Sequence, residues 1–425
     1  MQSVRDRLEA ILSRLAGRAS DETVYTRLYP EAARAAADAA DARRKAGVSL
    51  GPLDGTIVSI KDLFDVAGEP TTAGSLLRRT TPPAMQDAAI VRRLRQAGAV
   101  IPGKTNMTEF AFTAVGFNMH YGTPGNAADA SRIPGGSSSG AGVAVGEGTS
   151  DISIGSDIPA ALNGVVGFKP TARRVPLAGA FPLSATLDSV GPLARSVADC
   201  AAADAVMAGD DHYAPSPRSL AGLRVAIPRG LLFDGTEPEV MAAFEHALAG
   251  MEGAGARLAD ITIDDLIAQM RAATKRGSIA AMEGAEVHAD WLAEGAPVPV
   301  DPRVSEPLSR AATIPTPFYI RAMRRRVELA RAMNGRFEAV DILALPASPV
   351  LAPTISALKA DDALCDRVEG LMLRNTQVAN QFDLCAISLP VPGTALPVGL
   401  MLVARHGHDR HLFDIAAGVE ALLRR

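Results

Sequence analysis

The chain has 425 residues, of which 48% are hydrophobic and 21% are charged, so it is long enough for one large domain or two to three ordinary ones. A net charge of −4 provides no strong basic field for nucleic acid, and three widely spaced cysteines match no metal-ligand spacing and indicate a reducing compartment without disulfides. The apolar stretches are short or interrupted by proline, so no membrane span is expected.

Hydrophobic periodicity predicts alternating helices and strands along the chain. In chain order we expect an amphipathic N-terminal helix, an Ala-rich helix at about 31–46, a buried strand at 55–62, a helix at 87–98 capped by Asp87, a strand at 99–101, a helix followed by a strand at 238–262, strands at 340–346 and 398–405, and a C-terminal helix from 409 capped by Asp409. This alternation predicts an α/β fold with helices on both sides of a mainly parallel or mixed sheet. Gly, Pro and Ser concentrate between 122 and 192, which indicates a densely looped functional region.

Three short motifs match known expressions, but their contexts do not fit. Residues 98–105, "GAVIPGKT", follow a helix rather than a strand, so we interpret them as a helix–strand corner with Lys104 at the surface rather than a phosphate-binding loop. Residues 136–140, "GSSSG", are entered from a proline and glycine loop, whereas a nucleophile elbow is entered from a strand. The three histidines of "RHGHDRH", residues 405–411, have no obvious carboxylate or thiolate partner and indicate an exposed turn rather than a metal site.

The serine-rich stretch "PGGSSSGAG", residues 134–142, runs into a segment of small apolar residues that can pack as a helix. We therefore expect this loop to be clamped inside the core, with its hydroxyls held in place. Lys61 ends the strongly apolar strand "TIVSIK", and by itself it reads either as a strand-end lysine reaching solvent or as a lysine in a desolvated pocket. Burial lowers the pKa of a lysine, and a neutral amine can serve as the general base that a serine requires.

Several of these stretches together resemble the amidase-signature family, the Ser–cisSer–Lys amidohydrolases. The resemblance covers nearly the whole chain and rests on "GPLDGTIVSIKDLFDVAGEPTTAGS", "GAVIPGKTNMTEFAF", "GTPGN", "SRIPGGSSSGAGVAVGEG", "IPAALNGVVGFKPT", "LDSVGPLARSVAD", "DILALPASPVLAPT" and "LPVGLMLVA". It implies a single large α/β/α domain over 1–425, with a mixed central sheet covered by helices on both faces, a signature core at about 50–205 and an N-terminal helical segment at 1–48. It also implies that Lys61 is the catalytic lysine and that Ser137 is the cis-peptide serine, which relays a proton from the nucleophile to Lys61. The adjacent Ser138 would support this proton relay.

The implied activity is hydrolysis of a carboxylic amide, with ureido amides among the candidate substrates, to an acid and ammonia or an amine through an acyl-enzyme. The resemblance implies no metal and no cofactor, a small-molecule amide as substrate, and no contact with nucleic acid or membrane. A homodimer or an amidotransferase-type partner subunit is compatible with it, and the expected location is the cytoplasm.

One part of the family pattern is missing. The family segment has the form G-[ST]-D-T-G-G-S-[apolar]-R-[IF]-P-A, whereas this chain has "IGSDIPAALNG". About six residues are therefore absent between Asp157 and Ile158, and they would carry the acyl-forming serine and the N–H groups of the oxyanion hole. Ser156 occupies the position of the Ser/Thr that follows the family's glycine, so it is not the nucleophile.

Two explanations for this gap remain open from the sequence. Matching residues on both sides of a clean gap favour a recent or artificial loss from an active amidase. Continuous numbering favours a true absence in an inactive relative, which acts as a binding or complex subunit like the A subunit of a glutamine-dependent tRNA amidotransferase.

Overall fold

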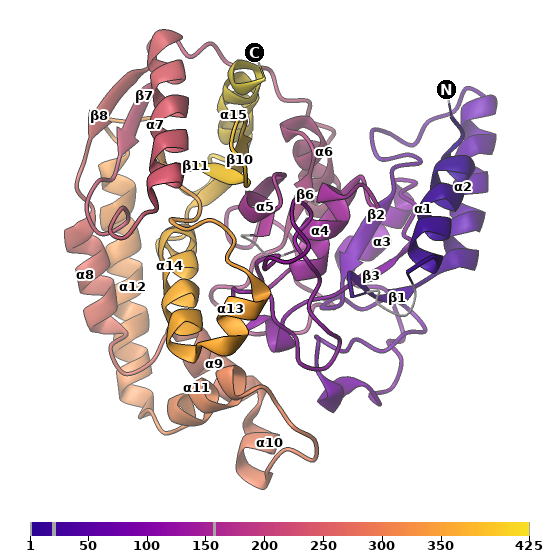
Figure 1. Ribbon diagram of the computed structural model, residues 1–425, viewed down its shortest axis with the longest axis horizontal. Helices are drawn as coiled ribbons and strands as arrows, with labels where there is room; N and C mark the ends of the chain where they lie inside the picture. The colour runs from indigo at the N-terminus through magenta and orange to yellow at the C-terminus, as the bar shows by residue number, and fades with distance from the viewer. Residues whose placement is uncertain (1, 19–22, 156–158, 425) are drawn as a thin grey trace.

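The computed structural model describes residues 2–18, 23–155 and 159–424 (Figure 1). The helices are α1 Val4–Ala16, α2 Pro30–Lys45, α3 Ala89–Gln96, α4 Ser139–Gly146, α5 Pro159–Leu162, α6 Val197–Ala208, α7 Pro238–Gly253, α8 Asp264–Ala273, α9 Ile279–Val287, α10 Ala289–Glu294, α11 Pro302–Ala312, α12 Thr316–Arg336, α13 Ile355–Ala360, α14 Asp362–Gln381 and α15 Asp409–Leu423. The strands are β1 Tyr25–Leu28, β2 Val58–Lys61, β3 Gly103–Thr105, β4 Ile152–Gly155, β5 Val166–Lys169, β6 Gly191–Ala194, β7 Arg224–Ile227, β8 Arg257–Asp260, β9 Ile342–Pro346, β10 Cys385–Val391 and β11 Val398–Ala404.

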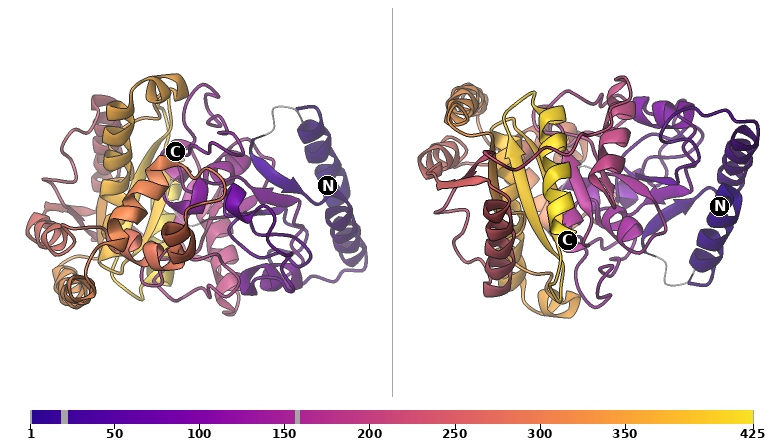
Figure 2. Two further views of the ribbon diagram at one scale, coloured as in Figure 1. Left: turned by 90° about the horizontal axis from the view of Figure 1, so that it is seen from below. Right: turned by 90° about the horizontal axis from the view of Figure 1, so that it is seen from above.

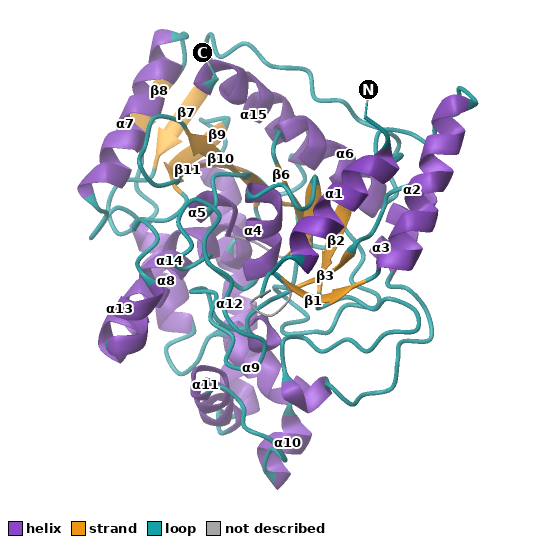
Figure 3. Cartoon of the chain, turned by 45° about the vertical axis from the view of Figure 1, so that its right-hand side comes forward, coloured by secondary structure: helices purple, strands orange, loops and turns teal. Residues whose placement is uncertain are grey.

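All of these strands join one mixed sheet of 11 strands in the order β1-β3-β2-β4-β6-β5-β10-β11-β9-β7-β8. The pairs β2–β3, β2–β4, β7–β8 and β7–β9 are parallel, and the other neighbouring pairs are antiparallel. The strands run through the centre of the molecule with helices around them (Figure 3). The fold is therefore the α/β architecture with a mixed central sheet that the sequence predicts.

Helices cover both faces of the sheet because alternate residues of a strand point to opposite sides. On one face Ile387 of β10 and Leu402 of β11 pack in a core with residues of α6, α7 and α15, such as Phe413. On the other face Ala386 and Met401 pack with residues of α5, α8, α12 and α14. Figure 2 shows the α1–α2 pair at one end of the molecule and α8 with α12 at the other.

Three local predictions are wrong, and for the two predicted helix caps the reason is a tertiary contact that takes the carboxylate. The strand expected at 99–101 makes only an isolated bridge from Val100 to Ile57, and the paired strand is β3, two residues further on. Asp87 does not cap α3, because its carboxylate accepts from the Ala67 amide and pairs with Arg95. Asp409 does not cap α15, because its carboxylate accepts hydrogen bonds of 2.8 Å and 2.7 Å from the backbone N–H and hydroxyl of Thr171.

Within the described part of the chain, no helix is both long enough and apolar enough to cross a membrane.

Candidate active site

Lys61 is the last residue of β2, and its side chain is fully buried at 0% exposure. β2 lies between the parallel strands β3 and β4 and is buried at every position, which explains the continuous apolar run that precedes Lys61. Nζ of Lys61 donates a hydrogen bond of 2.7 Å to Oγ of Ser137. Of the two alternatives for Lys61, the lysine in a desolvated pocket is confirmed, and the lysine that reaches solvent is wrong.

The serine loop is clamped as expected. The peptide bond between Gly136 and Ser137 is cis, which confirms that prediction. The Ser137 carbonyl accepts from the Thr108 amide at 3.0 Å, and the Gly140 amide donates to the Asn106 carbonyl at 2.9 Å. A Cβ at Gly140 would lie 2.2 Å from the Val24 carbonyl oxygen, so only glycine allows this close approach of the two backbones.

Ser138 is fully buried and lies against the end of β4. A Cβ on Gly155 would lie 2.7 Å from the Ser138 hydroxyl oxygen, so the last residue of β4 contacts the serine loop directly. The chain that follows, residues 156–158, includes Ser156, Asp157 and Ile158 and lies outside the described residues, as does the expected position of the missing nucleophile segment. The structure therefore brings Lys61, Ser137 and Ser138 together at the point where the family's nucleophile segment would begin.

Lys104 differs from the sequence-based interpretation, because it is buried at 1% exposure rather than at the surface. Its Nζ forms an ion pair of 3.2 Å with Asp62 Oδ1 and also donates to the Pro70 carbonyl at 3.0 Å. Asp62 directly follows Lys61 and also accepts a 3.1 Å hydrogen bond from the Thr26 hydroxyl. This pair holds the backbone beside Lys61 in place. No local pattern predicts the pair, because Lys104 lies in a segment that is typical of a corner at the surface.

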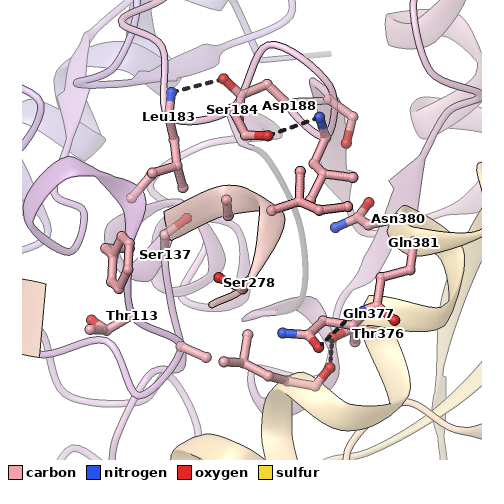
Figure 4. Close-up of a pocket in the computed structure, with 18 of the residues that line it drawn as sticks. Thr113, Ser137, Leu183, Ser184, Asp188, Ser278, Thr376, Gln377, Asn380 and Gln381 are labelled. Atoms are coloured by element: carbon pink, nitrogen blue, oxygen red, sulfur yellow. Dashed lines mark hydrogen bonds between the residues drawn. The ribbon is translucent and has the colours of Figure 1, made fainter. Parts of the chain in front are cut away.

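The Ser137 hydroxyl lies on the wall of a cavity of about 230 Å³ (Figure 4). In that view Ser137 lies on one side of the cavity, and the polar side chains of α14 lie on the other. One part of the lining is apolar, with Leu177, Phe181, Leu183 and Leu187. The polar part consists of hydroxyl and carboxamide side chains, namely those of Thr113, Thr274, Ser278, Thr376, Gln377, Asn380 and Gln381.

Asp188 is the charged residue in the described lining of this cavity. Its Oδ2 accepts a 2.9 Å hydrogen bond from the Leu183 amide. Burial raises the pKa of Asp188, against the opposing effect of the hydrogen bonds that its carboxylate accepts. Asp188 is part of the "LDSVGPLARSVAD" stretch, but its place in the cavity follows only from the tertiary structure.

A second carboxylate anchors the loop that carries Asp188. Glu283 of α9 accepts hydrogen bonds from the Ser184 hydroxyl, from the Thr186 amide at 3.0 Å and from the Tyr319 hydroxyl at 2.6 Å. These hydrogen bonds lower the pKa of Glu283 in spite of its partial burial. Residues of α9 and α12 therefore hold one wall of the cavity, and no local motif in the sequence marks them.

The histidine-rich turn at 405–411 is engaged in other contacts. His408 Nε2 accepts from Arg405 at 2.6 Å, and His406 lies 3.4 Å from a carboxylate oxygen of Asp383. Among the described residues, no group of three or more His, Cys, Asp or Glu side chains is placed so as to hold a metal ion.

A buried amine that contacts a serine hydroxyl on a cavity wall defines a candidate site for acyl transfer with a lysine base. The chain belongs to the Amidase family, whose model matches residues 6–413. Membership of this family relates the chain to hydrolases that act on amides.

Similar proteins cover nearly the full length of the chain. The 2-amino-5-chloromuconic acid deaminase of Comamonas testosteroni is 35% identical over 410 residues, which cover 92% of this chain and 86% of that protein. The 1-carboxybiuret hydrolase subunit AtzE of Pseudomonas sp. (strain ADP) is 35% identical over 430 residues, covering 95% and 91%. A solved crystal structure of an amidase superposes with a TM-score of 0.86 at 32% identity and covers 99% of this chain and 96% of its own. Further relatives are A subunits of glutamyl-tRNA(Gln) amidotransferases.

Proposed function

We propose that this site is built for hydrolysis of a small carboxylic or ureido amide through a Ser–cisSer–Lys acyl-enzyme mechanism. The observation that carries the proposal is the 2.7 Å hydrogen bond between fully buried Lys61 and Ser137 on the cavity wall. Burial of an amine away from water disfavours its charged form, and a neutral amine can accept a proton. In this proposal Ser137 passes the proton of the nucleophile to Lys61, and Ser138 supports the relay.

The remaining steps require the segment that the chain lacks. A serine in that segment would attack the amide carbonyl, and backbone N–H groups would stabilise the oxyanion. The nitrogen would leave with a proton returned by the relay, and water would then release the acid from the acyl-enzyme. The contact between Gly155 and Ser138 supports this arrangement, because the inserted residues would begin beside the relay.

The proposal predicts that the chain as it stands does not hydrolyse amides, and that inserting Thr-Gly-Gly-Ser-Ile-Arg between Asp157 and Ile158 produces the activity. The assay is ammonia release from a panel of aliphatic, aromatic and ureido amides before and after insertion. Loss of the nucleophile and of the oxyanion donors together accounts for a rate difference of many powers of ten. Amide turnover by the unaltered chain, or a folded repaired chain that is silent on the whole panel, would contradict the proposal.

Lys61→Ala in the repaired chain tests the base. We expect ammonia release to fall at least 10²-fold, the usual contribution of general-base catalysis. Lys45→Ala, which removes an exposed lysine at the end of α2, is the matched control and should leave the rate unchanged. Addition of a chelator should also leave the rate of the repaired chain unchanged, since the proposed steps use no metal.

A second candidate function is a non-catalytic subunit of a complex. Two observations favour it, namely the missing nucleophile segment and the relatives whose names describe subunits, of a 1-carboxybiuret hydrolase and of glutamyl-tRNA(Gln) amidotransferases. Light scattering on the isolated chain distinguishes a monomer from a homodimer. Co-purification of a second chain with the protein from its own cells would favour the subunit function.

A further inference from the structure

Ser137 differs from two other cavity serines, Ser184 and Ser278, in what its hydroxyl contacts. Ser184 donates to the carboxylate of Glu283, and Ser278 caps α9 by accepting from the Ala281 amide at 3.1 Å. Ser137 is instead bonded at 2.7 Å to the amine of Lys61. Its hydroxyl therefore combines contact with a candidate base and access to the cavity.

The surroundings of Ser137 also favour negative charge on its oxygen. Ser137 immediately precedes Ser138, the N-terminal cap of α4. α4 is buried throughout Ser139–Val145, and its N-terminus carries a partial positive charge from the aligned peptide dipoles. Negative charge that develops on a group bound at Ser137 should be stabilised by this end of the helix.

We propose that Ser137 and Lys61 form a serine–lysine dyad in which Ser137 itself accepts an acyl group from an activated ester. This activity shares the base Lys61 with the proposed function, but it does not need the missing segment. A lysine paired with a serine is a sufficient nucleophile and base in other acyl-transfer sites. Acylation of Ser137 by an activated ester is thus expected of the chain without any inserted residues.

The reaction balances with the groups present. With Lys61 neutral, the Ser137 O–H proton moves to Nζ as Oγ bonds to the carbonyl carbon of the ester. The C–O bond to the alcohol then breaks, and the alcohol leaves with the proton that Nζ holds. An activated ester suits this site because its leaving group needs little help, whereas an amide nitrogen must be protonated and its oxyanion strongly stabilised.

The volume of the cavity limits the size of the acyl group that Ser137 can accept. An apolar cavity of about 150 Å³ accommodates benzene in another protein, so about 230 Å³ corresponds to roughly nine non-hydrogen atoms. A butyryl or hexanoyl group fits within this limit. Hydrolysis of the resulting acyl-Ser137 should be slow, because the oxyanion donors of the family segment are missing and Ser137, once acylated, no longer relays a proton from water to Lys61.

The experiment uses the unaltered chain with p-nitrophenyl butyrate and, separately, a fluorophosphonate. We expect a burst of about one nitrophenolate per chain, the number set by a single nucleophile. Peptide mapping should locate a butyryl or phosphonyl adduct on Ser137. Lys61→Ala should lower the burst rate at least 10²-fold.

Serine variants identify the nucleophile. Ser137→Ala should abolish the adduct, whereas Ser219→Ala, outside the cavity, and Ser156→Ala should leave it unchanged. If Ser137→Ala does not fold, the adduct map on the unaltered chain still decides the question. An adduct on Ser156 or any other serine, or no adduct at all, would overturn the dyad.

The repaired chain separates this inference from the proposed function. If both hold, the label should move from Ser137 to the inserted serine once the segment is present. A label that stays on Ser137 in a repaired chain without amidase activity would support the dyad and count against the relay. Ammonia release by the repaired chain, together with an unlabelled unaltered chain, would support the relay and overturn the dyad.

Discussion

Lys61 and Lys104 show how two buried lysines on neighbouring strands acquire different roles. Lys61 pairs in the β2–β3 register with Thr105, and Lys104 pairs with Ile60, so the two side chains leave the sheet at adjacent positions. The charge of Lys104 is balanced by Asp62 at 3.2 Å, and removing one partner of such a buried pair costs about 4 kcal/mol. Lys61 contacts the hydroxyl of Ser137, and in the proposed function it accepts a proton through that serine.

His288 provides a test of pH dependence at the residue scale. It is 3% exposed, its Nδ1 accepts from the Trp291 indole at 3.0 Å, and its ring packs on Phe110. Burial lowers the pKa of His288 from 6.5 to about 4. Because the unfolded chain binds the proton first, folded stability is complete above 6.5 and falls as the pH decreases toward 4.

We therefore expect acid to cost up to about 3 kcal/mol of unfolding free energy through His288, at about 1.4 kcal/mol per pH unit. His288→Asn keeps an acceptor for Trp291 and should reduce the dependence of the unfolding free energy on pH in this range. His212→Asn, at an exposed position, should leave that dependence unchanged. Denaturant unfolding measured across this pH range checks the difference. Equal slopes in the wild type and His288→Asn would contradict the assignment.

At the scale of elements, α14 does more than cover the sheet. Its residues Thr376, Gln377, Asn380 and Gln381 line the cavity. An earlier turn of the same helix presents Glu369, whose carboxylate accepts from the amides of Ala114 and Val115 at 2.6 Å and 2.9 Å. One helix therefore supplies part of the cavity wall and anchors the opposite segment, since Thr113 and Ala114 also line the cavity.

We expect Glu369→Ala to lower the unfolding free energy by about 2–4 kcal/mol, because it leaves two buried N–H groups unsatisfied. Glu369→Gln keeps one acceptor oxygen in place and should cost less. Asp366→Ala removes an exposed carboxylate from the same helix and serves as the control. Chemical denaturation measures all three, and a Glu369→Ala variant as stable as the control would show that the two contacts contribute nothing.

For the whole molecule, the sheet order argues that the chain unfolds as a unit. β1–β6 fill one half of the sheet and β7–β11 the other, and the antiparallel β5–β10 pair joins the two halves into one continuous sheet whose core contains residues of both. We propose that residues 1–425 form one domain. Fluorescence of the single Trp291 and far-ultraviolet circular dichroism should then report coincident unfolding transitions. Two separated transitions would indicate independent units.

The residues that line the cavity come from segments spread over the chain. From their charges we predict that the cavity selects uncharged ligands over anionic ones. Its described lining contains Asp188 and no lysine or arginine, and the Oδ1 of Asn380 is buried without a hydrogen-bond donor. An uncharged amide can donate to such oxygens, whereas a carboxylate meets like charge and acceptors. We expect hexanamide to bind at least tenfold more tightly than adipamate, a difference of about 1.4 kcal/mol.

Calorimetric titration of the unaltered chain with both compounds checks this selectivity without requiring turnover. Asp188→Asn retains an oxygen for the Leu183 amide and should reduce the difference in affinity between hexanamide and adipamate. Glu306→Gln, at an exposed position on α11, should leave that difference unchanged. Adipamate binding as tightly as hexanamide would refute the selectivity. If the difference in affinity is unchanged in Asp188→Asn, groups other than Asp188 cause the selectivity.

The sequence alone determined the alternation of helices and strands, the family, and the choice of Lys61 and Ser137 as candidate site residues. These depend on hydrophobic periodicity and on motifs that are local in the chain. Only the tertiary structure decided which carboxylates cap helices and which are taken by distant partners, as with Asp87 and Asp409. It likewise decided that Lys104 is buried beside Asp62 and that Asp188 and α14 line the cavity. Hydrogen bonds and ion pairs between distant residues follow from how the strands are ordered in the sheet, and no local pattern encodes that order.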